Sequence, residues 1–126
     1  MTLAYWSLLT VIVITYSFTG IAKFWHKGYN NSCPRAYLEN LTGPAKRAYW
    51  AHLNSFEVLP QFAAGLIIAH QLKMPQDILD TTAVLFTASR ILYGFFYIKD
   101  MAWSRSFTWL FGMFCIAFLI VGKAFL

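Results

Sequence analysis

Polar and charged side chains recur at helical spacing within two otherwise apolar segments of this 126-residue sequence. Residues three and four positions apart lie on one face of a helix. One such set lies within residues 45–72, and a second lies along residues 77–99 and directly after them. The two sets are Arg47, Trp50, Asn54, Glu57 and Gln61, and Arg90, Tyr93, Tyr97 and Asp100. Together they offer cations, two carboxylates and hydroxyl groups, which can bind a charged small molecule.

The elements that must position these side chains are predicted to be membrane-spanning helices. Apolar residues make up 59% of the chain and charged residues 12%, about half the charged share of a soluble domain. Lipid can cover so much apolar surface, because helices satisfy their own backbone hydrogen bonds inside it. The pattern predicts an all-α, integral membrane four-helix bundle that forms one domain over residues 1–126. Its expected spans are about 3–24, 45–72, 77–99 and 105–121.

Basic residues gather at one end of this predicted bundle. The N-terminus has none and the second loop has only Lys73, whereas five of the ten Lys and Arg residues flank or occupy the first loop. Basic loops stay in the cytoplasm, so both termini are predicted to lie outside it. The location also favours anionic lipid headgroups as partners, and we expect no nucleic acid. The five residues are Lys23, Lys27, Arg35, Lys46 and Arg47.

The two polar faces are expected to meet, because ionisable groups in a membrane helix usually face the interior of the bundle. Glu57 lies about 18 Å along its helix from the cytoplasmic end and Arg90 about 14 Å along the next, so their depths match. Tyr93 and Tyr97 fall nearer the cytoplasmic surface, where Arg105 opens the last span. These residues, with Arg47 and Asn54, outline a cationic pocket. Two alternatives stay open: a structural Glu57–Arg90 ion pair, and tyrosines that serve only at the membrane interface.

No residue pattern in the sequence supplies a reactive centre of its own. His52 and His70 are interpreted as packing residues, because no second ligand has suitable spacing, and no metal is expected. The sequence also lacks a phosphate-binding glycine loop and any nucleophile–base pattern. Chemistry in this pocket would therefore use a reactive group that a ligand brings.

Two motifs resemble a known family over essentially the whole chain. The run RAYWAHLNSFEVLP at 47–60 resembles the second-helix signature of the membrane-associated proteins in eicosanoid and glutathione metabolism, the MAPEG family. The run RILYGFFY at 90–97, followed by Arg105 and Ser106, looks like that family's third-helix and loop signature. The nearest likeness is to the small bacterial branch, which implies a multi-pass protein of the bacterial inner membrane.

The resemblance implies an activity and a set of partners. Characterised members form homotrimers of four-helix protomers and bind glutathione between neighbouring subunits. Glutathione is thus the expected co-substrate of a transferase or peroxidase that acts on hydrophobic electrophiles. The expected partners are a second and third copy of the chain, membrane lipid and a lipophilic small molecule.

The resemblance also implies roles for seven residues. Those expected to stabilise the glutathione thiolate are Arg105, Tyr97 and Tyr93. Those expected to bind the rest of the molecule are Arg47, Asn54, Glu57 and Arg90. In this assignment the arginines face carboxylates and Glu57 faces the ammonium group.

Trp50 departs from the family pattern. Glutathione-binding members usually carry an arginine four residues before the signature Asn, and loss of that cation would cost about 1.5–3 kcal/mol of binding free energy. Lys46 or a loop of a neighbouring subunit is a candidate substitute. The alternative function is a non-catalytic MAPEG-like scaffold, or an accessory subunit of a larger complex, in which the polar faces only hold helices together.

Overall fold

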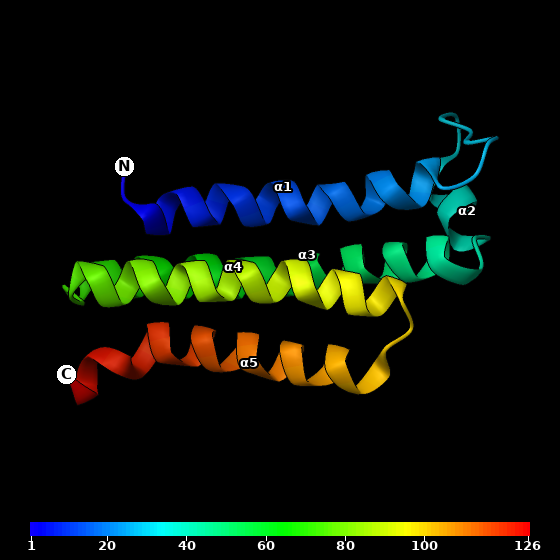
Figure 1. Cartoon of the computed structure of the whole chain (residues 1–126). Helices are drawn as coiled ribbons and strands as arrows, with labels where there is room; N and C mark the ends of the chain where they lie inside the picture. Colours follow the sequence, from blue (N-terminus) through cyan, green and yellow to red (C-terminus); the bar gives the residue numbers. More distant parts are fainter.

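The computed structural model describes all residues from Met1 to Leu126 and is entirely helical. Four long helices lie side by side, and both termini lie at the end of the bundle opposite the short second helix (Figure 1). This arrangement confirms the predicted all-α architecture. The elements are α1 (Leu3–Phe24), α2 (Pro34–Glu39), α3 (Gly43–Gln71), α4 (Gln76–Ile98), α5 (Ala102–Val121) and the 3₁₀ helix η1 (Gly122–Phe125).

Three helices are long and apolar enough to cross a membrane: α1, α4, and α5 together with η1. The remaining long helix, α3, has 29 residues and at 1.5 Å per residue extends about 43 Å. The mean hydropathy of α3 is lower than that of the other three helices, because α3 carries a polar face. It packs against α1, α4 and α5.

The apolar core runs along the middle of the bundle, where α3, α4 and α5 converge. The rings of Phe62 and Phe86 stack with their centroids 4.1 Å apart, and both side chains are fully buried. Gly65 lets α5 approach α3, because a Cβ at this position would lie 3.2 Å from the Cβ of Leu119. Close packing of this kind fixes the rotation of the helices that carry the polar faces.

Two sharp reversals place α3, α4 and α5 against one another. Lys73 and Asp100 follow α3 and α4 with φ angles of 55° and 61°. The backbone N–H of Met74 then donates to the carbonyl of Ala69 at 3.0 Å, as in a Schellman motif. The same bond recurs from Met101 to Phe96 at 2.9 Å. Because each reversal needs so few residues, the start of α3, the end of α4 and the start of α5 share one end of the bundle.

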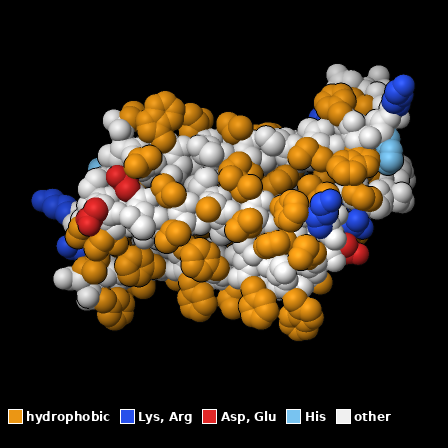
Figure 2. All heavy atoms as spheres, in the orientation of Figure 1, with side chains coloured by type: hydrophobic (Ala, Val, Ile, Leu, Met, Phe, Trp, Pro, Cys, Tyr) orange, Lys and Arg blue, Asp and Glu red, His pale blue; other side chains and the backbone are white.

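The surface has the distribution expected of a protein in lipid. Apolar side chains cover the length of the bundle, and charged side chains gather near its two ends (Figure 2). Many large apolar side chains are exposed, among them Phe114 at 66% and Val13 at 57%. A soluble protein would seldom leave so much apolar surface in water.

Candidate functional site

Arg90 is fully buried between α3 and α4 and is held by neutral groups. Its Nη2 donates to Asn54 Oδ1 at 3.1 Å and to Ser55 Oγ at 2.9 Å. Its guanidinium carbon lies 4.2 Å from the centre of the Tyr93 ring, which is a cation–π contact. The Nε of Arg90 has no partner. This arginine therefore binds α4 to α3 and leaves its positive charge without a carboxylate.

Glu57 does not form the expected direct ion pair with Arg90. Its Oε2 accepts a hydrogen bond from Asn54 Nδ2 at 3.2 Å, and the ion pair of the chain joins Lys46 to Glu39 at 3.8 Å. The reason is that Asn54 stands between the two charges, where its amide can accept from the cation and donate to the anion. The structure thus replaces the expected contact by an Arg90–Asn54–Glu57 relay.

Two adjoining hollows lie at the end of the bundle where α3, α4 and α5 meet, and together we call them the polar cleft. Both are lined by Asn54, Tyr93 and Tyr97. The first has a volume of about 250 Å³ and is completed by Arg105, Ser106 and Trp109. The second has a volume of about 410 Å³ and is completed by Trp50, Leu53 and Glu57.

The two hollows differ in electrostatic character. In the first, the guanidinium of Arg105 lies 4.4 Å from the centre of the Tyr97 ring, and Tyr93 and Ser106 line the same hollow. This group of donors suits an anion. In the second, Glu57 is the charged lining residue, among the rings of Trp50 and the tyrosines. A carboxylate surrounded by aromatic rings suits an ammonium group.

Five of the seven predicted site residues line the polar cleft, and the two others lie outside it. The five are Asn54, Glu57, Tyr93, Tyr97 and Arg105. Arg90 lies behind Tyr93 and is fully buried. Arg47 donates from Nε to the carbonyl of Ile98 at 3.0 Å. The last carbonyls of a helix lack partners within it, so Arg47 caps the end of α4.

Ser106 and Trp109 line the cleft but were not predicted as site residues. Both lie on α5, three residues apart, and Trp109 follows Arg105 by four. That helical spacing from Arg105 was the available signal, and it was hidden because the last span is otherwise apolar and aromatic. Ser106 adds a hydroxyl to the donors of the first hollow.

Trp50 forms an aromatic wall of the second hollow. Its ring centroid lies 6.3 Å from that of Tyr97, and the side chain is 44% exposed. Lys46 Nζ lies 5.9 Å from the Trp50 ring, but it donates to the carbonyls of Leu38 and Glu39 at 3.2 and 2.5 Å. Lys46 therefore ties α3 to the end of α2 and contributes no free cation beside Trp50.

Two of the three histidines, His52 and His70, take part in packing. His52 Nδ1 lies 2.7 Å from the carbonyl oxygen of Thr15, which links α3 to α1. The ring of His70 meets that of Tyr5 edge to face at 5.6 Å. The structure contains no group of three His, Cys, Asp or Glu side chains that could bind a metal ion.

Comparison with known proteins assigns the chain to a family. A search of curated proteins and a search of solved structures each found no match. The sequence model of the MAPEG family matches residues 2–125. With three helices able to cross a membrane, this match identifies an integral membrane protein. The polar cleft thus lies in a chain that belongs to the MAPEG family.

Proposed function

We propose that the protein is a membrane-bound, glutathione-dependent transferase or peroxidase that acts on hydrophobic electrophiles. Membership of the MAPEG family supports this kind of function. The observation that carries the proposal is the division of one cleft into an anion-binding end at Arg105 and an ammonium-binding end at Glu57. Glutathione has an ammonium group at one end and becomes a thiolate when it reacts.

In the proposed complex, the five cleft residues and the two arginines outside the cleft have separate tasks. The thiolate lies at Arg105, whose permanent charge lowers the pKa of the thiol, and Tyr97 or Tyr93 donates a second hydrogen bond. Glu57 receives the ammonium group of the γ-glutamyl end. Asn54 is oriented by Arg90, so Arg90 acts through Asn54 and not on a ligand carboxylate. Arg47 retains its Nη groups for a carboxylate, since only its Nε is engaged.

The chemistry itself belongs to glutathione. In a transfer, the thiolate sulfur forms a bond to the electrophilic carbon, and the displaced electron pair leaves with that carbon's substituent or is protonated. In a peroxidase reaction, two thiols reduce a hydroperoxide to an alcohol and water and become a disulfide. A hydrophobic acceptor would reach the sulfur from lipid, beside the half-exposed ring of Trp109.

Homotrimer formation belongs to the same proposal. Glu57 and Gln61 are exposed on the outward face of α3, and such groups are costly in lipid. A neighbouring copy would cover them and would close the second hollow from outside. The cleft would then lie between subunits.

A non-catalytic scaffold is the second candidate function, and two observations favour it. Arg47 and Arg90 both serve helix packing, and Trp50 stands where a cation would be needed to grip a second carboxylate. In this alternative the polar groups hold α3 to α4 and to neighbouring copies, and the protein acts as an accessory subunit.

Titration of the purified protein with glutathione separates the two candidates. We expect binding at millimolar glutathione, measured as heat by calorimetry, and a rise in ultraviolet thiolate absorbance. Absence of both signals would refute the enzyme proposal and leave the scaffold.

The variant Trp50→Arg tests the weak point of the enzyme proposal. It restores the missing cation, so we expect about ten to a hundred times tighter binding of glutathione. Leu53→Arg is a matched control, because Leu53 lines the same hollow on the same helix. An equal gain in both variants would show that the effect is general charge attraction.

A further inference from the structure

The segment that joins α1 to α2 projects beyond the ends of α1, α4 and α5, at the end of the bundle where α3 begins (Figure 1). We define the basic-aromatic loop as residues 23–37, from the last turn of α1 into α2. None of its residues lines the polar cleft, so the proposed function makes no use of it. Three features of the loop indicate which ligand it binds: its positive charge, its aromatic rings and its position at the end of a membrane-capable helix.

The loop carries positive charge without compensation. Lys23, Lys27 and Arg35 lie within it, and the first acidic residue after Lys23 is Glu39. Glu39 is already paired with Lys46. Lys27 and Arg35 are exposed, and no carboxylate lies within 4.0 Å of them. The opposite end of the bundle differs in its balance of charges, because there Lys73 and Lys123 are equalled in number by Asp77 and Asp80, although none of the four forms an ion pair.

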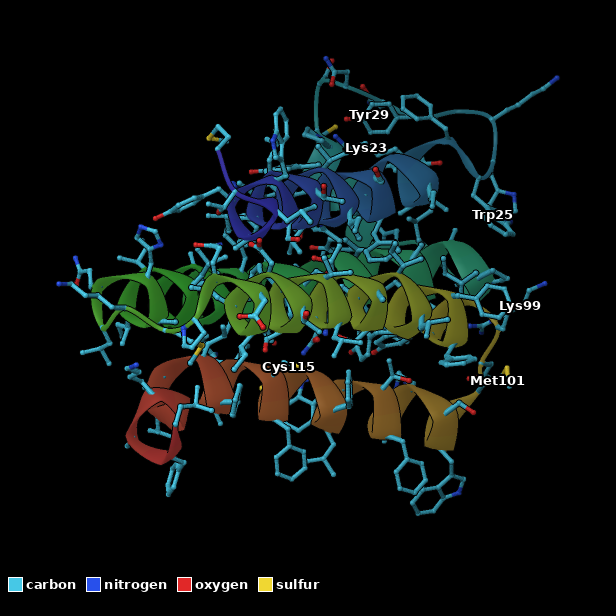
Figure 3. All side chains as sticks on the ribbon, turned by 60° about the vertical axis from the view of Figure 1, so that its left-hand side comes forward. Lys23, Trp25, Tyr29, Lys99, Met101 and Cys115 are labelled. Carbon is cyan, nitrogen blue, oxygen red and sulfur yellow. The ribbon has the colours of Figure 1, made fainter.

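Aromatic contacts give the loop a fixed shape. The ring of Tyr29 meets Phe24 at 5.6 Å and Tyr37 at 5.2 Å, both edge to face. Lys23 Nζ lies 5.1 Å from the centre of the Tyr29 ring, and Figure 3 shows the two residues together. Gly28 adopts a φ of 103°, a conformation that favours glycine. The basic groups are therefore carried on an ordered support.

The loop also contains a hollow directly after the end of α1. Residues 24–29 line a space of about 590 Å³. The segment follows α1 directly, and α1 is one of the three membrane-capable helices. Phe24 is 73% exposed and Trp25 46% exposed. Exposed aromatic rings at the end of a spanning helix occupy the boundary between acyl chains and headgroups.

We propose that the basic-aromatic loop is a binding site for the headgroup of an anionic phospholipid. Lys27 and Arg35 face the phosphate from the water side. Phe24 and Trp25 lie against the glycerol and upper acyl region. Uncompensated positive charge selects an anionic headgroup over a zwitterionic one, by about fivefold for each basic residue near the surface.

Fluorescence quenching by brominated lipids tests the proposal at Trp25. The protein is reconstituted in bilayers that contain acyl-brominated phosphatidylglycerol or, at equal mole fraction, acyl-brominated phosphatidylcholine. The difference between the wild type and Trp25→Phe isolates the signal of this residue. We expect phosphatidylglycerol to quench Trp25 at least about threefold more than phosphatidylcholine.

Trp6 supplies the matched control at the other end of the bundle. It is 52% exposed, close to the value of Trp25. The difference between wild type and Trp6→Phe should show equal quenching by the two lipids. Equal quenching at Trp25 as well would overturn the proposal. So would the absence of quenching by either lipid there, since that would place a second copy of the chain over the loop.

Charge removal tests the electrostatic part of the proposal. Lys27→Gln with Arg35→Gln should abolish the preference for phosphatidylglycerol at Trp25, and so should high salt, which screens exposed charges. Lys73→Gln with Lys123→Gln removes the same charge from the other end and should leave the preference intact. Both double variants change exposed or half-exposed side chains, and circular dichroism verifies that the helices are retained. A preference that survives the first double variant would refute the role of these cations.

Discussion

Asn54 hydrogen-bonds two charged side chains, the buried Arg90 and the exposed Glu57. Its amide accepts from Arg90 and donates to Glu57. Asn54→Ala would remove both bonds and leave Arg90 with Ser55 alone. We expect the free energy of unfolding to fall by about 2–4 kcal/mol, measured by denaturant titration in detergent.

Asn40→Ala is the control for that variant. Asn40 also makes a side-chain hydrogen bond, from Nδ2 to the carbonyl of Ala36 at 2.9 Å, but it is exposed. We expect it to change stability by less than about 0.5 kcal/mol. Equal losses in the two variants would mean that Arg90 does not rely on the relay.

Arg105 makes a separate prediction, about thiol chemistry. Arg105→Ala removes the cation of the first hollow, so the ultraviolet thiolate signal of bound glutathione should disappear at neutral pH. Turnover should fall by about a hundredfold. Lys99→Ala removes an exposed cation near the same end of the bundle and should alter neither quantity. An unchanged thiolate signal in Arg105→Ala would assign thiol activation to the tyrosines.

At the residue scale, helical spacing predicted which side chains share a face, and four of the predicted site residues on these faces line the cleft. The fifth predicted site residue that lines it, Arg105, was placed by its position at the start of the last span. Helical spacing could not predict which atoms bond. Glu57 and Arg90 were matched in depth, but the choice between a direct pair and a relay depends on a small rotation of each helix. Arg47 was assigned to a ligand because the free carbonyls at the end of α4 are invisible until the helices are placed together.

Between elements, α1 packs tightly against α4 at Gly94. A Cβ on Gly94 would lie 1.9 Å from Phe18 Cζ, so no side chain fits there without a shift. Gly94→Ala should lower the free energy of unfolding by about 1–3 kcal/mol. It should also disturb the neighbouring Tyr93, which is visible as weaker glutathione binding.

A second substitution shows whether the clash is the cause. Phe18→Leu in the Gly94→Ala background makes room for the new methyl group and should recover part of the lost stability. Gly20→Ala is the control, because a Cβ there meets nothing within 4 Å. Failure of Phe18→Leu to rescue would mean that Gly94 matters for another reason.

The first turn of α1 depends on a residue of α4. Asp80 Oδ1 accepts from the backbone N–H of Ala4 at 2.7 Å and from Gln76 Nε2 at 2.8 Å. A carboxylate at a helix N-terminus accepts a hydrogen bond from a free N–H and interacts favourably with the positive end of the helix dipole. Asp80→Ala should therefore speed hydrogen exchange in residues 4–7 by about tenfold, measured by mass spectrometry.

Asp77 offers the comparison for this helix end. It lies in the first turn of α4, is exposed and makes no side-chain hydrogen bond to α1. Asp77→Ala should leave exchange in residues 4–7 unchanged. If hydrogen exchange in residues 4–7 became equally fast in both variants, the effect of Asp80 would come from its negative charge alone and not from its hydrogen bond to Ala4.

The elements themselves were largely readable from the sequence. Apolar runs and short polar breaks predicted four long helices, and the helix bounds differ from the expected spans by at most a few residues. The second predicted span, residues 45–72, corresponds to α3. Its mean hydropathy is below that of the three membrane-capable helices, because α3 carries the polar face that lines the cleft. Because α3 must carry polar side chains for the site, it cannot be as apolar as a helix that only spans lipid.

For the whole molecule, the outward face of α3 predicts self-association. Gln61 is exposed in the single chain, and the proposed homotrimer would bury it. Gln61→Trp should therefore reduce the trimer fraction seen by native mass spectrometry from mild detergent. Phe114→Trp, on the exposed face of α5, should leave it unchanged. A wild-type protein that is monomeric at all concentrations would contradict the prediction.

The uneven composition of α3 and α4 has a consequence for how the chain enters the membrane during synthesis. α3 emerges from the ribosome before α4, and its polar face makes it a poor substrate for release into lipid alone. α4 carries Arg90, whose hydrogen-bond partners Asn54 and Ser55 are on α3. The tight reversal at Lys73 lets the two helices meet as soon as the second is made. We therefore expect α3 and α4 to enter the lipid together as a preassembled hairpin, after α1 has been inserted.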